Sequence, residues 1–229
     1  MKLILFDIDG TLLWTDGAGR RAMEGALFGM FGHHGDPAYR YDGKTDRQIV
    51  REQMRSAGVD DADISSRMHD VLQSYVWLLE LELRDVASAR LCAGVRPLLD
   101  AVEAQEHATI GLLTGNIEQG ARRKLQAVDL DFARFRVNAF GCDHEDRPQL
   151  PVVAQQRAEA FFGTTMPGEH MVIIGDTPAD IQCGRSLGAR AIGVATGRYS
   201  VDELAAHNPA AVFETLEDTD AVLEALLGG

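Results

Sequence analysis

The sequence predicts an α/β protein with a parallel sheet, helices on both faces of the sheet, and an all-helical insertion. Short runs of apolar residues recur along the chain, and each leads into a longer amphipathic stretch. These runs are apolar throughout rather than alternating, which is typical of strands covered on both faces. One segment, between Thr11 and about Gly94, shows helical periodicity and little strand signal. Together these observations predict a Rossmann-like, doubly wound parallel sheet interrupted by a helical domain.

Six short apolar runs are the expected strands. The clearest is M-V-I-I at 171–174, which leads into a polar segment and then a helix. The expected strands cover 3–8, 108–113, 135–140, 171–174, 189–195 and 211–213, and the helices 117–128, 150–162, 178–187, 201–206 and 216–227.

The helical insertion lies between the first expected strand and the rest of the sheet. Apolar residues recur there at helical spacing, and core packing explains such stripes: Ala22, Met23, Ala26, Leu27, Met30 and Phe31, then Leu72, Tyr75, Val76 and Leu79. We therefore predict two domains, a core domain of residues 1–13 and 90–229 and a helical domain of residues 14–89.

The composition limits the partners. The 229 residues carry a net charge of −13, which argues against nucleic acid and anionic membrane surfaces because both attract excess Lys and Arg. Cys92, Cys142 and Cys183 lie far apart, a usage typical of a reducing cytoplasm. Asp7 interrupts the first apolar run too early for a signal peptide, and no stretch reaches the roughly 18 apolar residues that span a membrane. We expect a cytoplasmic protein, either a monomer or a homodimer.

Three polar clusters follow expected strands, at the edge where open parallel sheets bind ligands. They are Asp7 with Asp9, the run 114–116 (T-G-N), and Asp176 with Asp180. Each cluster alone has an ordinary structural explanation as a turn or a helix cap. Four carboxylates at converging strand ends would repel one another, however, and a bound cation removes that difficulty. Oxygen ligands with room for water suit Mg²⁺.

The motifs carry a family resemblance. D-I-D-G-T-L from Asp7, L-L-T-G-N at 112–116 and I-I-G-D-T-P-A-D ending at Asp180 resemble the haloacid dehalogenase superfamily, in its phosphatase branch and close to phosphoglycolate phosphatases. The motifs occur in the family's order, and the helical insertion lies where that family has its cap domain. The resemblance implies a Mg²⁺-dependent enzyme that acts on a phosphate ester.

The resemblance also implies roles for the first cluster. Asp7 would be the nucleophile that forms an aspartyl-phosphate, and it would also touch the metal. Asp9 would protonate the leaving alcohol and then activate water, with its backbone carbonyl as a further metal ligand. Residues two apart at a strand end share a side, although a turn at Gly10 alters the aim of Asp9. Gly10 would let the backbone approach the phosphoryl group closely. Dehalogenases lack the second aspartate, so Asp9 favours phosphoryl transfer.

The other two clusters receive roles in the same way. Thr114 would hold one phosphoryl oxygen, and the amides near it, at Gly115 and Asn116, would assist. Asp176 would bind the metal directly, and Asp180 would bind the metal or its waters.

One position departs from the family pattern. The family has a basic residue near the nucleophile, usually a lysine in a G-K-P context, whereas residues 141–148 here read G-C-D-H-E-D-R-P. Arg147 is the first candidate because it precedes the next core helix, and its guanidinium can fork two oxygens. Lys124 in A-R-R-K-L is the alternative, unless it is an exposed helix charge.

Substrate choice is expected to depend on the helical domain, which would close over the cleft. The run 41–46 (Y-D-G-K-T-D) resembles the substrate-facing loop of phosphoglycolate phosphatases and β-phosphoglucomutases. Gly43 and Lys44 are therefore candidates for substrate binding, with Lys44 facing a carboxylate. An ordinary helix start capped by Thr45 or Asp46 explains the same residues.

The sequence thus predicts a Mg²⁺-dependent phosphatase of a small phosphorylated metabolite, most like phosphoglycolate phosphatase. A β-phosphoglucomutase-like phosphotransferase, a pyrophosphatase and a nucleotidase remain alternatives. A homologue that binds phosphate without turnover is the alternative outside the enzymes.

Overall fold

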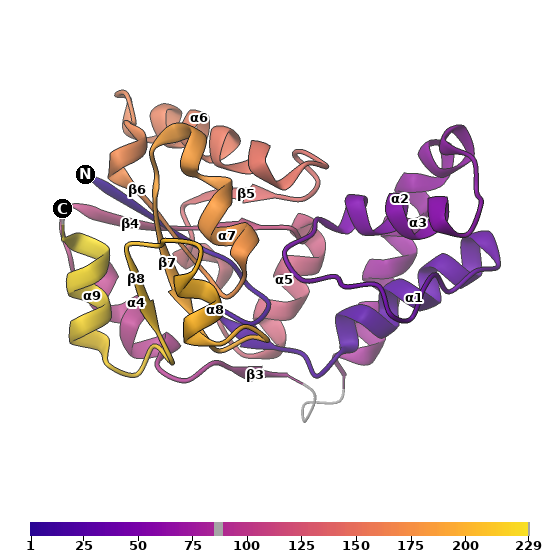
Figure 1. The fold of residues 1–229 in the computed structure, drawn as a ribbon, viewed down its shortest axis with the longest axis horizontal. Helices are drawn as coiled ribbons and strands as arrows, with labels where there is room; N and C mark the ends of the chain where they lie inside the picture. Colours follow the sequence, from indigo (N-terminus) through magenta and orange to yellow (C-terminus); the bar gives the residue numbers. More distant parts are fainter. Residues whose placement is uncertain (85–88, 229) are drawn as a thin grey trace.

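A six-stranded parallel sheet lies at the centre of the larger part of the molecule (Figure 1). The computed structural model describes residues 1–84 and 89–228. In spatial order the strands are β5 (Val137–Phe140), β4 (Ala108–Thr114), β1 (Lys2–Phe6), β6 (Met171–Gly175), β7 (Arg190–Val194) and β8 (Ala211–Phe213), and every neighbouring pair is parallel. The chain builds outward from β1 to one side through β4 and to the other through β6. This confirms the predicted doubly wound sheet and places its switch point beside β1.

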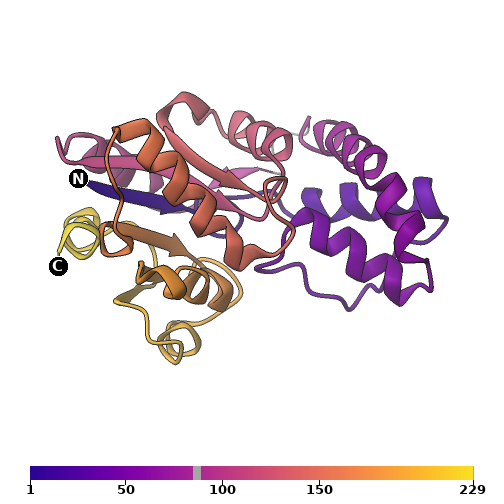
Figure 2. The same ribbon diagram turned by 90° about the horizontal axis from the view of Figure 1, so that it is seen from above.

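Helices cover both faces of the sheet (Figure 2). Ile4 and Phe6 of β1 pack in one apolar cluster with α4 (Val95–Glu103), α5 (Glu118–Ala127) and α9 (Thr219–Leu227). Leu3 and Leu5 pack in a second cluster with α6 (Leu150–Phe162) and α7 (Pro178–Cys183). Successive side chains of a strand point to opposite faces. A strand buried on both faces must therefore be apolar, as β1 is at its four buried residues, 3–6.

Some elements differ from the sequence prediction. The expected helix over 178–187 divides at Gly184 into α7 and a 3-10 turn, Arg185–Leu187. The helix α4 was not predicted; Pro97 lies in its first turn, where a missing N–H breaks no helical hydrogen bond. The short helix α8 is Val201–Ala205, and further 3-10 turns cover Phe132–Arg134, Arg147–Gln149 and Gly168–His170.

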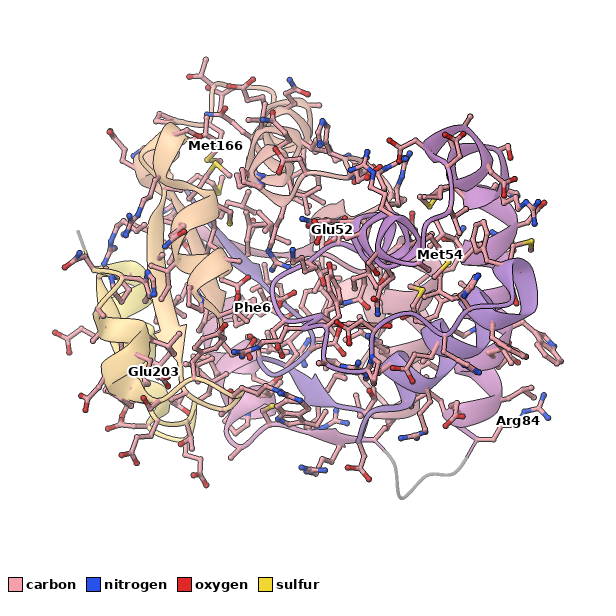
Figure 3. All side chains as sticks on the ribbon, turned by 45° about the vertical axis from the view of Figure 1, so that its right-hand side comes forward. Phe6, Glu52, Met54, Arg84, Met166 and Glu203 are labelled. Carbon is pink, nitrogen blue, oxygen red and sulfur yellow. The ribbon has the colours of Figure 1, made fainter. Side chains whose placement is uncertain are left out.

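Three helices form a separate unit beyond the end of the sheet (right-hand side of Figure 1). They are α1 (Ala18–Phe31), α2 (Asp46–Ser56) and α3 (Asp61–Glu82), and their buried apolar residues form one cluster, which Ile117 before α5 also joins. In Figure 3, Met54 of α2 lies within this unit, whereas Glu52 lies nearer the sheet. The short antiparallel pair β2 (Leu13–Trp14) and β3 (Arg90–Leu91) flanks the unit in sequence.

The predicted division into residues 1–13 with 90–229 and residues 14–89 stays a prediction, and 85–88 lie outside the described residues.

Side-chain caps fix where two of these helices begin. Thr45 accepts a hydrogen bond from the Gln48 amide at the start of α2, and Asp60 accepts one from the Ala62 amide at the start of α3. Gly32, in the left-handed conformation, ends α1. Within the described ranges, no helix is both long and apolar enough to cross a membrane.

The core of the helical unit predicts a contrast between two large residues on α3. Leu79 is fully buried, whereas Trp77 is 61% exposed. We expect Leu79→Ala to lower the free energy of unfolding by about 2 to 4 kcal/mol, because the substitution leaves a cavity. Trp77→Ala, the matched control, should change the same quantity by less than about 1 kcal/mol. Urea denaturation measures both, and equal losses would contradict the burial of Leu79 in this core.

Candidate active site

The site lies where the central strands end. Asp7 follows β1, Thr114 is the last residue of β4, and Asp176 follows β6. The parallel register of these three strands brings their carboxyl ends to one edge. A cleft of about 500 Å³ opens between this edge and the helical unit, and residues of both parts line it. The predicted clusters therefore meet in one cleft.

Three buried carboxylates gather at the base of the cleft. Ligand oxygens of Asp7, Asp176 and Asp180 all lie within 4.8 Å of one another. Burial raises the pKa of Asp7 to about 6, with the neighbouring carboxylates adding to the shift and Arg147 opposing it. Burial, with the charges of Asp180 and Asp7 adding to it, raises the pKa of Asp176 well above its usual range. Hard oxygen donors whose charges repel one another fit a small divalent cation.

Asp9 is not part of this group. Its carboxylate lies with Lys124 of α5, whereas Asp7 lies with Arg147, just before α6. Because α5 and α6 cover opposite faces of the sheet, Asp7 and Asp9 do not share a side. Simple alternation fails because β1 ends at Phe6 and a tight turn with a left-handed Gly10 follows. The contact between the backbone carbonyl of Asp9 and a metal ion stays a prediction.

The structure requires a glycine at position 10 for a reason that the sequence did not reveal. A Cβ at this residue would overlap the carboxylate of Asp176, so only glycine lets β6 bring that aspartate against the turn. Thr11 donates its hydroxyl hydrogen bond to Asp176 Oδ1 over 3.3 Å. The turn after β1 therefore positions Asp176 as well as Asp9.

Asp180 also starts α7. One carboxylate oxygen accepts hydrogen bonds from the amide and the hydroxyl of Thr177, at 3.0 and 2.6 Å, within a capping box. The other oxygen pairs with Arg147. The helix-cap explanation weighed for this aspartate is therefore correct, and the same side chain also belongs to the carboxylate group.

Both candidates for the basic residue lie at the site, with different partners. Arg147 is buried, pairs with Asp180, and places Nη2 3.4 Å from Asp7 Oδ2. Its Nε has no hydrogen-bond partner among the described residues. Lys124 is buried too, with Nζ 2.8 and 2.7 Å from the two oxygens of Asp9. The exposed-charge interpretation of Lys124 is therefore wrong, because α5 turns this side chain toward the cleft.

Asn116 connects the strand-end clusters. Its amide nitrogen donates to Thr114 Oγ1 at 2.8 Å and to Asp9 Oδ2 at 2.7 Å. Its carbonyl oxygen accepts from Lys124 at 2.6 Å. Gly115, between the two polar residues, lies under the backbone of Lys44, and a Cβ there would overlap the Lys44 carbonyl. The T-G-N run thus contacts the acidic site and the helical unit at once.

The loop before α2 combines the two explanations given for it. Thr45 caps α2, as the helix-start explanation requires. Gly43 and Lys44 also line the cleft. Lys44 pairs with Glu52 at 2.8 Å, and a Cβ on Gly43 would lie 2.6 Å from the Cβ of Ala179 in α7. The loop is therefore seated against the start of α7.

Asp46 is a residue that the sequence identified only as part of a helix start. Its buried carboxylate accepts a hydrogen bond from the Ile117 amide at 2.8 Å, just before α5. Its own amide donates to the Gly115 carbonyl at 2.8 Å. No sequence pattern reveals these contacts, because the partners are about 70 positions apart.

Comparison with known proteins agrees with the motifs. Residues 150–219 match the family model described as HAD-hydrolase-like, where HAD stands for haloacid dehalogenase. The chain is 24% identical to the probable phosphatase IndB of Dickeya dadantii (strain 3937), over 98% of this chain and 94% of that protein.

Solved structures share this fold. One is a hydrolase from Pseudomonas syringae, with a TM-score of 0.73 and 21% identity over 98% of both chains. Another is a predicted phosphoglycolate phosphatase from Haemophilus somnus 129PT, with a TM-score of 0.71 and 19% identity over 97% of this chain and 98% of that one. The chain is therefore similar to a haloacid dehalogenase-like family model over residues 150–219, to a probable phosphatase over nearly its whole length, and in fold to these two structures.

The burial of Asp46 predicts a pH dependence of stability. Burial, as the largest cause, raises its pKa from 3.8 to about 6. The native state then holds a proton that the unfolded state has lost, so the free energy of unfolding falls as pH rises from about 4 to 6. Asp46→Asn keeps an oxygen for the Ile117 amide but does not titrate. We therefore expect the free energy of unfolding to decrease with pH by roughly 2 to 3 kcal/mol less in this variant than in the wild type.

Urea denaturation between pH 4 and 7, in EDTA, measures this difference. Asp7 and Asp176 titrate in both proteins and cancel in the comparison. Parallel stability curves for the wild type and Asp46→Asn would contradict a raised pKa at Asp46.

Proposed function

We propose that this chain is a Mg²⁺-dependent phosphatase that hydrolyses a small phosphorylated metabolite through a phosphoryl group carried on Asp7. The observation that supports this most directly is the set of neighbours around Asp7. The buried carboxylate of Asp7 lies within 4.8 Å of ligand oxygens of Asp176 and Asp180, and beside the guanidinium of Arg147. A second aspartate, Asp9, lines the same cleft and forms an ion pair with a different cation, Lys124.

Asp7, Asp176 and Asp180 are the residues that would hold the metal ion. The three carboxylates offer hard oxygen donors that fit a divalent ion, and burial together with the neighbouring carboxylates raises the pKa of Asp7 and of Asp176. When bound, Mg²⁺ supplies positive charge that lowers the repulsion between a carboxylate nucleophile and a phosphate ester.

The first half-reaction belongs to Asp7 and its neighbours. A carboxylate oxygen of Asp7 attacks phosphorus, and the bond from phosphorus to the leaving oxygen breaks. Arg147, whose guanidinium lies beside Asp7, would neutralise phosphoryl charge. The Thr114 hydroxyl, at the end of β4, would donate to a phosphoryl oxygen, with the nearby amides of Gly115 and Asn116 assisting.

Asp9 serves both halves of the reaction. It gives a proton to the leaving alcohol, and in the second half it takes a proton from the water that attacks phosphorus and releases Asp7. Its side chain is 41% exposed, so a proton can reach it from the cleft. Asp7 is almost fully buried, which suits a group that reacts out of contact with bulk water.

The helical unit would select the substrate. Lys44 lines the cleft, and a substrate carboxylate could replace Glu52 as the partner of its ammonium. This supports a small phosphorylated acid such as phosphoglycolate, and one structural relative is described as a predicted phosphoglycolate phosphatase. A pyrophosphatase, a nucleotidase and a phosphotransferase are the alternatives that a substrate panel separates.

A metal site predicts opposite effects of Asp176→Asn in two conditions. Without metal, the variant should be more stable than the wild type, because a strained carboxylate is removed from the cluster. With Mg²⁺ at about 100 times its dissociation constant, the wild type should gain about 2.7 kcal/mol, and the variant much less. Thermal unfolding with EDTA and with Mg²⁺ measures both. Asp70→Asn, an exposed change on α3, is the control. Equal gains in both variants would contradict the metal assignment.

The function itself is tested by phosphate release from a panel of esters. We expect Mg²⁺-dependent release from phosphoglycolate to exceed release from sugar phosphates, nucleotides and pyrophosphate. Asp7→Asn should lower turnover by at least about 10³-fold with an unchanged circular dichroism spectrum, since an amide cannot act as the nucleophile. Full activity in that variant would exclude Asp7 as nucleophile. Release spread evenly over the panel would keep the mechanism and reject the substrate.

A further inference from the structure

Lys124 is a buried cation whose partners differ from those of Arg147. Its side chain is 5% exposed, and Nζ lies 2.8, 2.7 and 2.6 Å from Asp9 Oδ1, Asp9 Oδ2 and Asn116 Oδ1. Arg147 instead pairs with Asp7 and Asp180. The two cations thus divide the carboxylates of the site between them.

The ion pair joins a buried ammonium, that of Lys124, to a partly exposed carboxylate, that of Asp9. Burying an ammonium is costly unless its hydrogen bonds are satisfied, and Lys124 satisfies them with Asp9 and Asn116. The Asp9 side chain is 41% exposed, so water alone could solvate it. Stability therefore does not require a buried partner for Asp9. The contact instead fixes the orientation of the Asp9 carboxylate, because both of its oxygens accept hydrogen bonds from Lys124 Nζ.

Neighbouring groups hold the ammonium in turn. Asn116 donates to Asp9 Oδ2 at 2.7 Å while accepting from Lys124, which closes a three-membered ring of contacts. Asp46, from the helical unit, adds an attractive charge toward Lys124. The orientation of Asp9 therefore depends on α5, on the T-G-N run and on the seating of α2.

We propose that Lys124 is a positioning residue for Asp9, which it holds toward the leaving oxygen of the substrate. This rests on the proposed phosphatase function. Proton transfer at a positioned carboxylate is worth roughly 10² to 10⁴ in rate, and an error of about 1 Å in position removes much of that gain. Lys124 thereby acts on the proton step and leaves phosphoryl charge to Arg147.

The chemistry of the leaving group separates these two roles. An alkyl phosphate releases an alkoxide-like oxygen that needs a proton, whereas 2,4-dinitrophenyl phosphate releases a stable phenolate without one. Lys124→Met removes the ammonium at nearly equal length. We expect this variant to lower kcat for the best alkyl ester by roughly 10- to 100-fold, with KM changed by less than about threefold. In rapid mixing with the dinitrophenyl ester, the first turnover should stay within about threefold of the wild type, since it needs no acid.

Two variants control the experiment. Arg123→Met removes the neighbouring positive charge, which is exposed on the same helix and pairs with Glu80, and should leave both rates unchanged. Lys124→Arg keeps a cation at the position and should recover part of the alkyl-ester rate. Thermal unfolding of each variant shows that the fold is retained.

Three results with an active wild type would overturn the proposal. Alkyl-ester turnover within twofold of the wild type would show that Lys124 is not needed. Faster turnover would show that it holds Asp9 in an idle orientation. An equal loss in the first turnover of both esters would show that it acts on the phosphoryl group. If the wild type itself releases phosphate from neither ester, the phosphatase function fails, and that failure is seen before any variant is compared.

Discussion

The mutual repulsion of three buried carboxylates is the constraint around which this molecule is arranged. Asp7, Asp176 and Asp180 come from the ends of two neighbouring strands and from the first turn of α7. Their oxygens are close enough that burial and like charge raise the pKa of Asp7 and of Asp176. Such a group persists only because the parallel register of β1 and β6 fixes the backbones, and because Arg147 supplies one compensating charge.

The sheet also explains why two cations are present instead of one. Asp7 lies beside Arg147, on the face of the sheet that α6 covers. Asp9, in the turn at Gly10, pairs with Lys124 of α5, which covers the other face. A doubly wound sheet offers helices on both faces at its switch point, so each aspartate can have its own partner. Two carboxylates two residues apart can then differ in burial and in surroundings, which is what distinct chemical roles require.

The sequence predicts the larger features well because each depends on a local pattern. Strands buried on both faces must be apolar throughout, so β1 and β6 are visible in the sequence, and the polar clusters after them mark the site edge. Patterns cannot show how distant segments meet. The burial of Lys124 depends on which side of α5 faces the cleft, and the bond from the Ile117 amide to Asp46 joins two separate units. The aim of Asp9 depends on turn geometry that alternation does not describe.

The same contacts show that the helical unit is more than a cover for the cleft. Thr45 donates its hydroxyl hydrogen bond to the Glu145 carbonyl at 2.6 Å, two residues before Arg147, while Asp46 binds the backbone on both sides of Asn116. The loop that carries Gly43 and Lys44 therefore rests on the segments that carry the two compensating cations. A substrate that moves this loop would shift Arg147 and the surroundings of Asp9 together, because close-packed contacts transmit displacement. The position of this loop and the geometry of the acidic site are thus physically coupled through a few hydrogen bonds.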